Sequence, residues 1–162
     1  MTIYIAADHT GIILKTALVE YLQEALSYEV EDMGAHEIAP DDDYPDYVVP
    51  CAKKVVANQG SLGIVIGGSG QGEAMAANRV SGVRAALFYG QAHATGPIDA
   101  LGAPALDGYD IIRLAREHNN ANILSLAARF ITLDDAKEAV RIFLSAGFTA
   151  DERHVRRIQK LG

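Results

Sequence analysis

The stretch LGIVIGGSGQGE, residues 62–73, carries the clearest fold signal in this chain. Its first five residues form a β-prone run of the kind that becomes a central parallel strand covered on both faces. The glycine loop at residues 67–72 then ends the strand, and a helix is expected from about Glu73 to Arg79. A strand, a tight loop and a helix in this order begin a right-handed βαβ unit.

Strands and helices alternate on both sides of this stretch. A β-prone run opens the chain at residues 2–7, and apolar residues at helical spacing follow it. We therefore predict a doubly wound parallel α/β sheet flanked by helices, in one domain that spans residues 1–162. Further strands are expected near residues 28–31, 83–88 and 123–127, and helices near residues 14–22, 45–56, 110–118, 134–144 and from about 151.

One segment does not fit this alternation. Residues 89–109 contain four glycines and two prolines and show little periodicity. Loops of this length are uncommon inside compact domains and are usually functional or mobile. We therefore expect an inserted loop at about residues 89–110 that serves as a lid or as a contact between subunits.

The composition limits the partners of the protein. Its net charge is -7, and nucleic acid is not expected as a partner because phosphate backbones attract basic surfaces. The apolar runs are too short to span a bilayer, and the first residues lack the features of a secretory signal. We expect a cytoplasmic protein without a membrane partner. The single cysteine, Cys51, permits no disulfide framework, and no group of residues has metal-ligand spacing.

Two groups of polar residues directly follow predicted strands. They are Asp8 with His9, and the glycine loop with Glu73. Both lie at carboxyl ends of strands, where open α/β sheets bind their ligands. The backbone N–H groups of a glycine loop at a helix N-terminus form a nest that attracts anions. A tight turn without any ligand is the structural alternative.

Glu73 separates this loop from two familiar phosphate-binding loops. A Walker A loop needs Lys after its last glycine and a dinucleotide loop needs Gly there, whereas this chain has Glu73. A carboxylate beside an anion nest suits proton abstraction next to a carbonyl, because the base takes the proton and the nest holds the enediolate charge. The alternative is a glutamate that only complements the helix dipole.

Five motifs then occur together in the order and spacing of a known family: Ala7–Gly11, Asp43–Pro45, Gly67–Asn78, Arg116–Asn120 and Arg153–Arg157. With them the chain resembles ribose-5-phosphate isomerase type B, whose framework is shared by the galactose-6-phosphate isomerase subunits. The resemblance covers nearly the whole chain except residues 89–109. It implies a Rossmann-like α/β fold, no metal, no cofactor, and a homodimer or dimer of dimers with active sites at the subunit boundary.

The same resemblance implies roles for single residues. Many members carry a catalytic Cys at the position of Gly67, whereas this chain matches the subgroup whose base is a glutamate, here Glu73. His118 is implied as the acid that opens the furanose ring, with help from Asp8. The implied substrate-binding residues are Gly68, Ser69, Gly70, Gln71 and Gly72 around the sugar's O1 and O2, Asn119 on the sugar, and His9, Arg129, Arg153, His154 and Arg157 on the phosphate.

The implied reaction is the isomerisation of ribose 5-phosphate to ribulose 5-phosphate. Glu73 would move a proton from C2 to C1 while the phosphate contacts hold the reacting carbons against it. Arg153 and Arg157 are spaced i, i+4 and share a helix face, which suits a phosphate but also a solvated basic surface.

Other assignments stay open. Asp8 could simply cap the following helix, and His118 could complement a helix dipole. The substrate could instead be galactose 6-phosphate, allose 6-phosphate or a tetrose phosphate. A non-catalytic phosphosugar-binding module is a further alternative. The joint presence of Glu73, His118 and Asp8 favours the enzyme, because binding alone needs no base.

Overall fold

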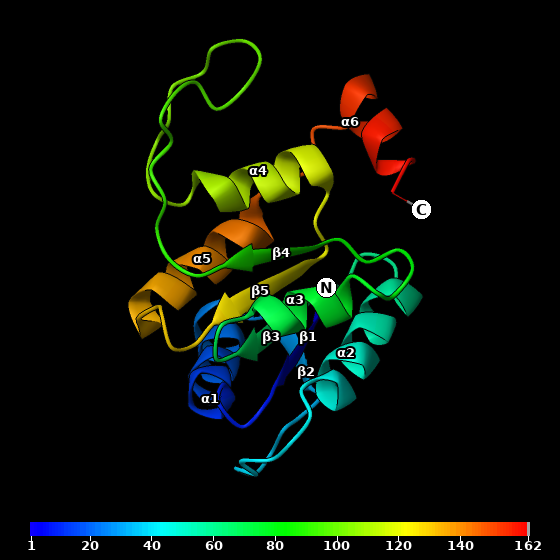
Figure 1. The fold of residues 1–162 in the computed structure, drawn as a ribbon, viewed down its shortest axis with the longest axis vertical. Coiled ribbons are helices and arrows are strands. Elements are labelled where there is room, and N and C mark those ends of the chain that lie inside the picture. The colour runs from blue at the N-terminus through cyan, green and yellow to red at the C-terminus, as the bar shows by residue number, and fades with distance from the viewer. Residues whose placement is uncertain (162) are drawn as a thin grey trace.

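A computed structural model describes residues 1–161 as a parallel sheet between two layers of helices (Figure 1). The sheet has five strands in the order β2-β1-β3-β5-β4. All four neighbouring pairs are parallel, so every strand ends at the same edge. The strands are β1 (Thr2–Ala7), β2 (Glu29–Asp32), β3 (Leu62–Gly67), β4 (Ala85–Phe88) and β5 (Ile123–Ala127).

Helices cover both faces of the sheet, which confirms the doubly wound α/β architecture. One face packs against α1 (Ile12–Glu20) with the π-helical turn η1 (Tyr21–Ala25), α4 (Asp110–Asn119) and α5 (Leu133–Ser145). The other face packs against α2 (Pro45–Ala57) and α3 (Gln71–Ala77). The last helix, α6 (Glu152–Ile158), contacts α4. No helix among residues 1–161 is both long enough and apolar enough to cross a membrane.

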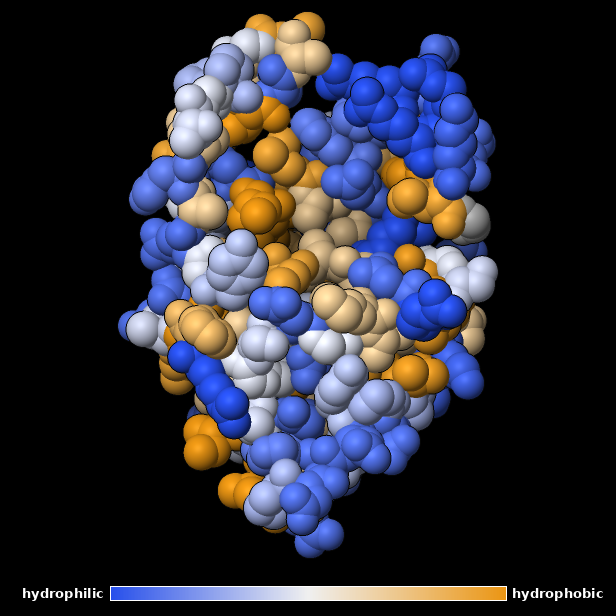
Figure 2. Space-filling model, viewed as in Figure 1, coloured by the Kyte–Doolittle hydropathy of each residue, from blue (hydrophilic) through white to orange (hydrophobic). Residues whose placement is uncertain are grey.

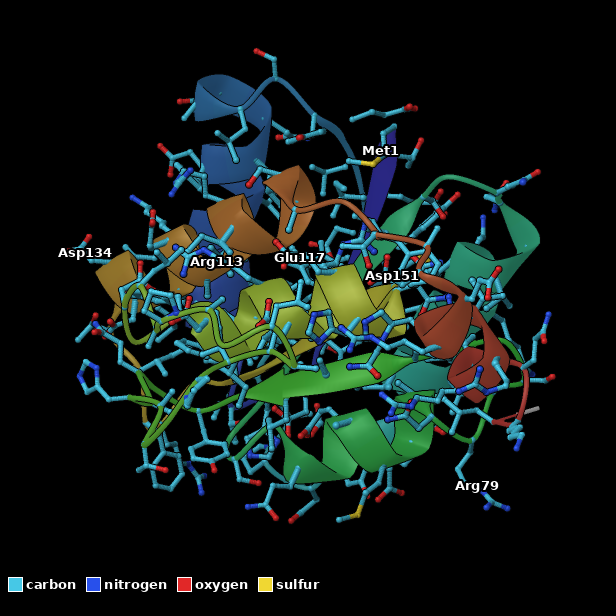
Figure 3. All side chains as sticks on the ribbon, turned by 90° about the horizontal axis from the view of Figure 1, so that it is seen from above. Met1, Arg79, Arg113, Glu117, Asp134 and Asp151 are labelled. Atoms are coloured by element: carbon cyan, nitrogen blue, oxygen red, sulfur yellow. The ribbon has the colours of Figure 1, made fainter. Side chains whose placement is uncertain are left out.

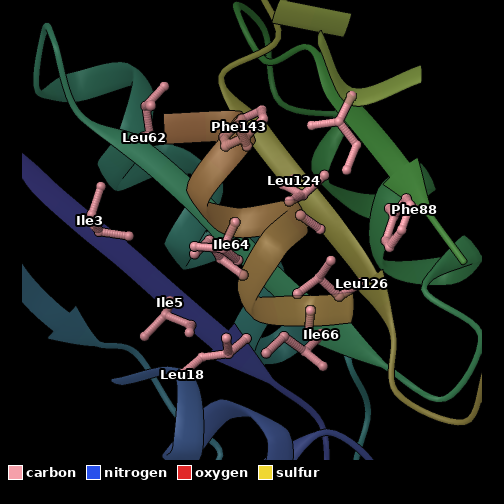
Figure 4. Close-up of a cluster of buried hydrophobic side chains, with 14 of the residues drawn as sticks. Ile3, Ile5, Leu18, Leu62, Ile64, Ile66, Phe88, Leu124, Leu126 and Phe143 are labelled. Atoms are coloured by element: carbon pink, nitrogen blue, oxygen red, sulfur yellow. The ribbon is translucent and has the colours of Figure 1, made fainter. Parts of the chain in front are cut away.

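The core consists of two apolar clusters, one on each face of the sheet. Alternate residues of a strand point to opposite faces, so Ile3 and Ile5 enter one cluster while Tyr4 and Ala6 enter the other. In the first cluster, leucines of α1 and Phe143 of α5 pack on the side chains of β1, β3 and β5 (Figure 4). Because the central strands are apolar on both faces, the sheet is buried on both sides.

The predicted strands and helices are all present, and several of their boundaries are shifted by one or two residues. Two of these shifts have a visible cause. Strand β4 begins at Ala85 instead of Val83, because the backbone N–H of Arg84 donates to the Asn122 side chain at 2.8 Å. Helix α3 begins at Gln71, two residues earlier than expected, because Gly70 adopts a left-handed conformation with φ 68° and caps it.

Residues 89–109 form neither a helix nor a strand. Their base is fixed, since the Ala92 N–H donates to the Gly108 carbonyl at 2.9 Å. Gln91 Nε2 and the Tyr109 hydroxyl each donate to Asp135 Oδ1 of α5 at 2.8 Å. From this base the segment extends beyond α4 (Figure 1, upper left). Its roles as lid or subunit contact stay predictions.

Candidate active site

The strand order creates a crevice at the carboxyl edge of the sheet. From β1 the chain passes to β2 on one side, and β3 lies on the other side. Such a switch point leaves a crevice outside the strand ends, where ligands bind in open α/β sheets. A pocket of about 500 Å³ lies there. It is lined by Asp8, His9, Thr10, Tyr44, Gly68, Ser69, Gly72, Glu73, Arg129 and Phe130.

Glu73 is the buried carboxylate of this pocket. It lies in the first turn of α3, and only 4% of its surface is exposed. Burial is the main cause that raises the pKa of the Glu73 carboxyl, and the charge of Asp8 adds to it. A carboxylate with a raised pKa is a stronger base than an exposed one, which suits proton abstraction near neutral pH.

The glycine loop leaves space for that carboxylate. A Cβ built on Gly67 would overlap the Glu73 side chain, so the absence of a side chain at Gly67 admits Glu73 into the pocket. Gly70 turns the chain into α3, and its carbonyl accepts a bond from Ser125 Oγ at 2.6 Å. Glu73 lies in the first turn of α3. The first N–H groups of this helix are close to it in the chain and have no intrahelical acceptor.

Asp8 and His9 also line the pocket. Asp8 Oδ1 accepts bonds from the Thr10 backbone at 2.9 Å and the Thr10 hydroxyl at 2.5 Å, so this oxygen supports the turn before α1. His9 Nδ1 lies 2.5 Å from Asp42 Oδ1, and the His9 backbone N–H donates to Asp42 Oδ2 at 2.9 Å. Single ligand atoms of Asp8, His9 and Asp42 lie within 4.8 Å of one another, but the direct bond to Asp42 already uses His9 Nδ1.

Some of the predicted site residues therefore meet in one pocket. They are Asp8, His9, Gly68, Ser69, Gly72, Glu73 and Arg129. Gly70 and Gln71 belong to the same loop without lining this pocket. Gln71 instead lines an adjoining hollow of about 370 Å³ beside Tyr89 and Phe130.

The remaining predicted residues form a second cluster, on α4 and α6. His118 stacks on His154 with ring centroids 4.3 Å apart and planes 15° from parallel. Burial, followed by the charge of His118, lowers the pKa of His154. Arg153 Nε donates to His154 Nε2 at 3.3 Å. Because only 4% of His154 is exposed, its geometry indicates a packing role against His118.

This second cluster lies at the amino end of the sheet. Asn119 ends α4 just before β5 begins, and its carbonyl accepts a bond from Arg84 Nε at 3.0 Å, next to the start of β4. In Figure 3, Glu117 of α4 and Asp151 before α6 lie near each other. Asp134, which follows the carboxyl end of β5, lies far from both. Figure 2 shows hydrophilic residues gathered over α6. At about 3.3 Å per residue, the five residues of β5 separate the clusters by about 16 Å. The cluster comprises His118, Asn119, Arg153, His154 and Arg157.

Sequence reasoning assigned no role to Tyr44 and Phe130, which line the pocket, or to Asp42, which contacts His9. Asp42 is one of three consecutive aspartates, and its burial depends on contacts that appear only in the fold. Tyr44 packs against Gly72, where an added Cβ would meet its ring at 2.8 Å. Phe130 is 67% exposed at the rim of the pocket. A large apolar residue just after the last strand was the available signal for Phe130.

The fold and pocket define a class of protein. The chain is a Rossmann-like α/β protein with a carboxylate beside a glycine loop at the switch point of its sheet. The family model of the ribose/galactose isomerases matches residues 3–99 and 103–161. The chain therefore belongs to the ribose/galactose isomerase family. The two matched stretches are separated by residues 100–102, which lie inside the long segment between β4 and α4.

Individual relatives match over nearly their whole length. The chain is 38% identical over 161 residues to ribose-5-phosphate isomerase B of Mycobacterium leprae, covering 99% of this chain and 88% of the relative. Among solved structures, the enzyme of Mycoplasma genitalium with bound ribulose 5-phosphate is 39% identical with a TM-score of 0.83, covering 99% and 93%. The enzyme of Clostridium thermocellum is 36% identical with a TM-score of 0.84, covering 100% and 95%.

Proposed function

We propose that this protein interconverts ribose 5-phosphate and ribulose 5-phosphate, with Glu73 as the base. The observation that carries the proposal is the buried Glu73 carboxylate beside the glycine loop, at the switch point of the sheet. Membership in the ribose/galactose isomerase family and the relative solved with ribulose 5-phosphate support the same substrate class. A cytoplasmic location stays a prediction.

The pocket supports a proton-transfer mechanism through an enediolate. Glu73 takes the proton from C2 of the open-chain sugar and returns it to C1, while a proton passes from O2 to O1 so that the C1 aldehyde becomes a hydroxyl and the C2 hydroxyl becomes a ketone. The N–H groups at the start of α3 stabilise the negative charge that develops on the sugar oxygens. His9 and Arg129 line the pocket and bind the phosphate. Holding the phosphate fixes the reacting carbons against Glu73.

We further propose that two copies of the chain complete each active site. Opening of the furanose ring needs an acid, and His118 is the predicted one. In a single chain, His118 lies at the amino end of the sheet, about 16 Å from the pocket by strand length. A homodimer that places α4 and α6 of one copy over the pocket of the other would bring His118, Asn119, Arg153 and Arg157 to the substrate. His154, whose ring stacks on His118, stays a predicted phosphate contact.

The decisive test is ribulose 5-phosphate formation by the wild type and Glu73→Gln. Loss of a general base typically costs about 100- to 10,000-fold, and we expect kcat to fall by that amount. Glu20→Gln, an exposed change on α1, is the matched control and should keep wild-type kcat. Both enzymes are assayed with and without EDTA, and the wild type should be insensitive to it.

A substrate panel tests the alternatives. Galactose 6-phosphate, allose 6-phosphate and a tetrose phosphate are compared with ribose 5-phosphate by kcat/KM. A higher kcat/KM on one of them would change the substrate while keeping Glu73 as the base. A wild type that binds these sugars without converting any would support the phosphosugar-binding module. A Glu73→Gln variant that keeps more than a tenth of wild-type kcat would remove Glu73 as the base.

A further inference from the structure

His9 and Asp42 form a closely bonded pair at the wall of the pocket. Asp42 Oδ1 lies 2.5 Å from His9 Nδ1, and Asp42 Oδ2 accepts the His9 backbone N–H at 2.9 Å. Both oxygens of the Asp42 carboxylate thus bond to His9, which lies 33 positions earlier in the chain. The Asp42 side chain is 5% exposed, whereas that of His9 is 26% exposed and lines the pocket. Asp42 therefore contacts His9 from behind.

This contact determines which histidine nitrogen faces the ligand. A carboxylate only accepts hydrogen bonds, so His9 Nδ1 carries the proton of the shared bond. The tautomer of a histidine follows from the bond that one of its nitrogens makes, and Nε2 is then the nitrogen left for a ligand. Asp8 does not compete for the ring, because its Oδ1 accepts bonds from Thr10 and Gly11.

The charges of the pocket make this orientation useful. Among the residues that line the pocket, His9 and Arg129 are those that can carry positive charge, while Asp8 and Glu73 are acidic. An anionic group needs donors on the side away from Glu73. With Nδ1 bonded to Asp42, the His9 ring presents Nε2 to the pocket. In a doubly protonated ring both nitrogens are donors, so Nδ1 donates to Asp42 and Nε2 donates to a phosphate oxygen.

We propose that Asp42 is a positioning residue that holds His9 Nε2 toward the pocket and thereby builds half of a phosphate subsite with Arg129. Asp42 itself does not touch the substrate. The identity of the ligand as a sugar phosphate rests on the proposed function, but the paired geometry does not. Partners that orient a metal-binding histidine typically change metal affinity about 10- to 100-fold when they are removed, and we expect an effect in that range on phosphate affinity.

The test compares Asp42→Asn, His9→Asn and the double variant by calorimetric binding of inorganic phosphate. Asp41→Asn is the control, because it removes the same charge from the same loop at an exposed position. We expect Asp42→Asn and His9→Asn each to weaken phosphate binding about 10-fold or more. The double variant should bind no more weakly than His9→Asn, because without the ring Asp42 has no side chain to orient, and Asp42→Asn keeps an oxygen for the backbone N–H of residue 9. Asp41→Asn should bind like the wild type.

Proton NMR of the wild type gives a second readout that needs no stable variant. A histidine that shares Nδ1–H with a carboxylate gives a far-downfield proton signal, which should sharpen or shift on addition of phosphate. Three results would each overturn the proposal. The first is an Asp42→Asn variant that binds phosphate as tightly as Asp41→Asn, and the second is a double variant in which the two losses of affinity multiply. The third is a wild type without the downfield signal. Neither readout uses turnover, so a protein inactive on every sugar phosphate would refute the proposed function and leave this test intact. In the active enzyme, Asp42→Asn should raise KM far more than it lowers kcat.

Discussion

Glu73 and Gly67 compete for the same volume at the end of β3. The Glu73 side chain fills the space into which a Cβ at Gly67 would project. The resemblance to ribose-5-phosphate isomerase type B places a catalytic Cys at the Gly67 position in many members. A side chain at position 67 and a carboxylate from position 73 therefore exclude each other in this pocket. This steric relation gives a physical reason for the pairing of Gly67 with Glu73.

Gly67→Ala tests that relation with a single methyl group. The added Cβ must displace the Glu73 carboxylate, and misplacing a catalytic group by about 1 Å can cost about 100-fold in rate. We expect kcat to fall by that order while the fold persists, measured by ribulose 5-phosphate formation alongside thermal unfolding. Gly147→Ala is the control, since an added Cβ there meets nothing within 4 Å. Unchanged kcat in Gly67→Ala would mean that Glu73 does not act from this position.

At the scale of elements, the hydrophobic pattern predicted each strand and helix, because the spacing of buried residues follows the periodicity of the secondary structure that they form. The continuous apolar runs at β1 and β3 became central strands, and the spaced leucines of α1 entered the core. One of the boundaries that differed depends on a bond between distant residues. Asn122 takes the Arg84 N–H that would otherwise extend β4, and no local pattern contains that information. The same reasoning explains why the burial of Asp42 was not predictable.

Asp135 connects two elements and has a pH-dependent effect on stability. It caps α5 with Thr132 and accepts bonds from Gln91 and Tyr109, at the base of the long segment. These hydrogen bonds, that of Gln91 first, lower the pKa of Asp135 from 3.8 to about 2. Because the folded-state pKa is depressed, the contribution of Asp135 is complete above the ordinary pKa and is lost as the pH falls through about 2.

We expect Asp135→Ala to lower the free energy of unfolding by about 2 kcal/mol at pH 7, through the lost cap and hydrogen bonds. The difference from the wild type should shrink in urea titrations at pH 3, where part of the ionic contribution is gone. Asp134→Ala, one residue earlier in the same helical turn, should cost far less because it makes none of these bonds. Equal losses in both variants would assign the effect to helix charge alone.

At the scale of the whole molecule, the predicted site divides into two clusters. Family motifs identified Glu73 and His118 together, and the resemblance implied active sites at a subunit boundary. Only the sheet topology indicates which residues belong to which end, because Glu73 follows β3 while His118 precedes β5. The motifs do not predict the path of the long segment 89–109, because that path depends on the hydrogen bond between Gln91 and Asp135 of α5. In the proposed homodimer, one chain would therefore contribute two different half-sites.

Two half-sites per chain predict that inactive subunits can complement each other. Glu73→Gln and His118→Asn should each be nearly inactive as homodimers. In a mixed dimer, a two-fold interface would place both substitutions in one site and leave the other site intact. We therefore expect mixed dimers, coexpressed with two different tags and purified through both, to recover about half of the wild-type activity per dimer. The control is the tandem-purified dimer of two Glu73→Gln chains, which should stay inactive. If the mixed dimer is no more active than the two parent homodimers, Glu73 and His118 do not act in a site shared between subunits. A wild type that light scattering shows to be monomeric would lead to the same conclusion.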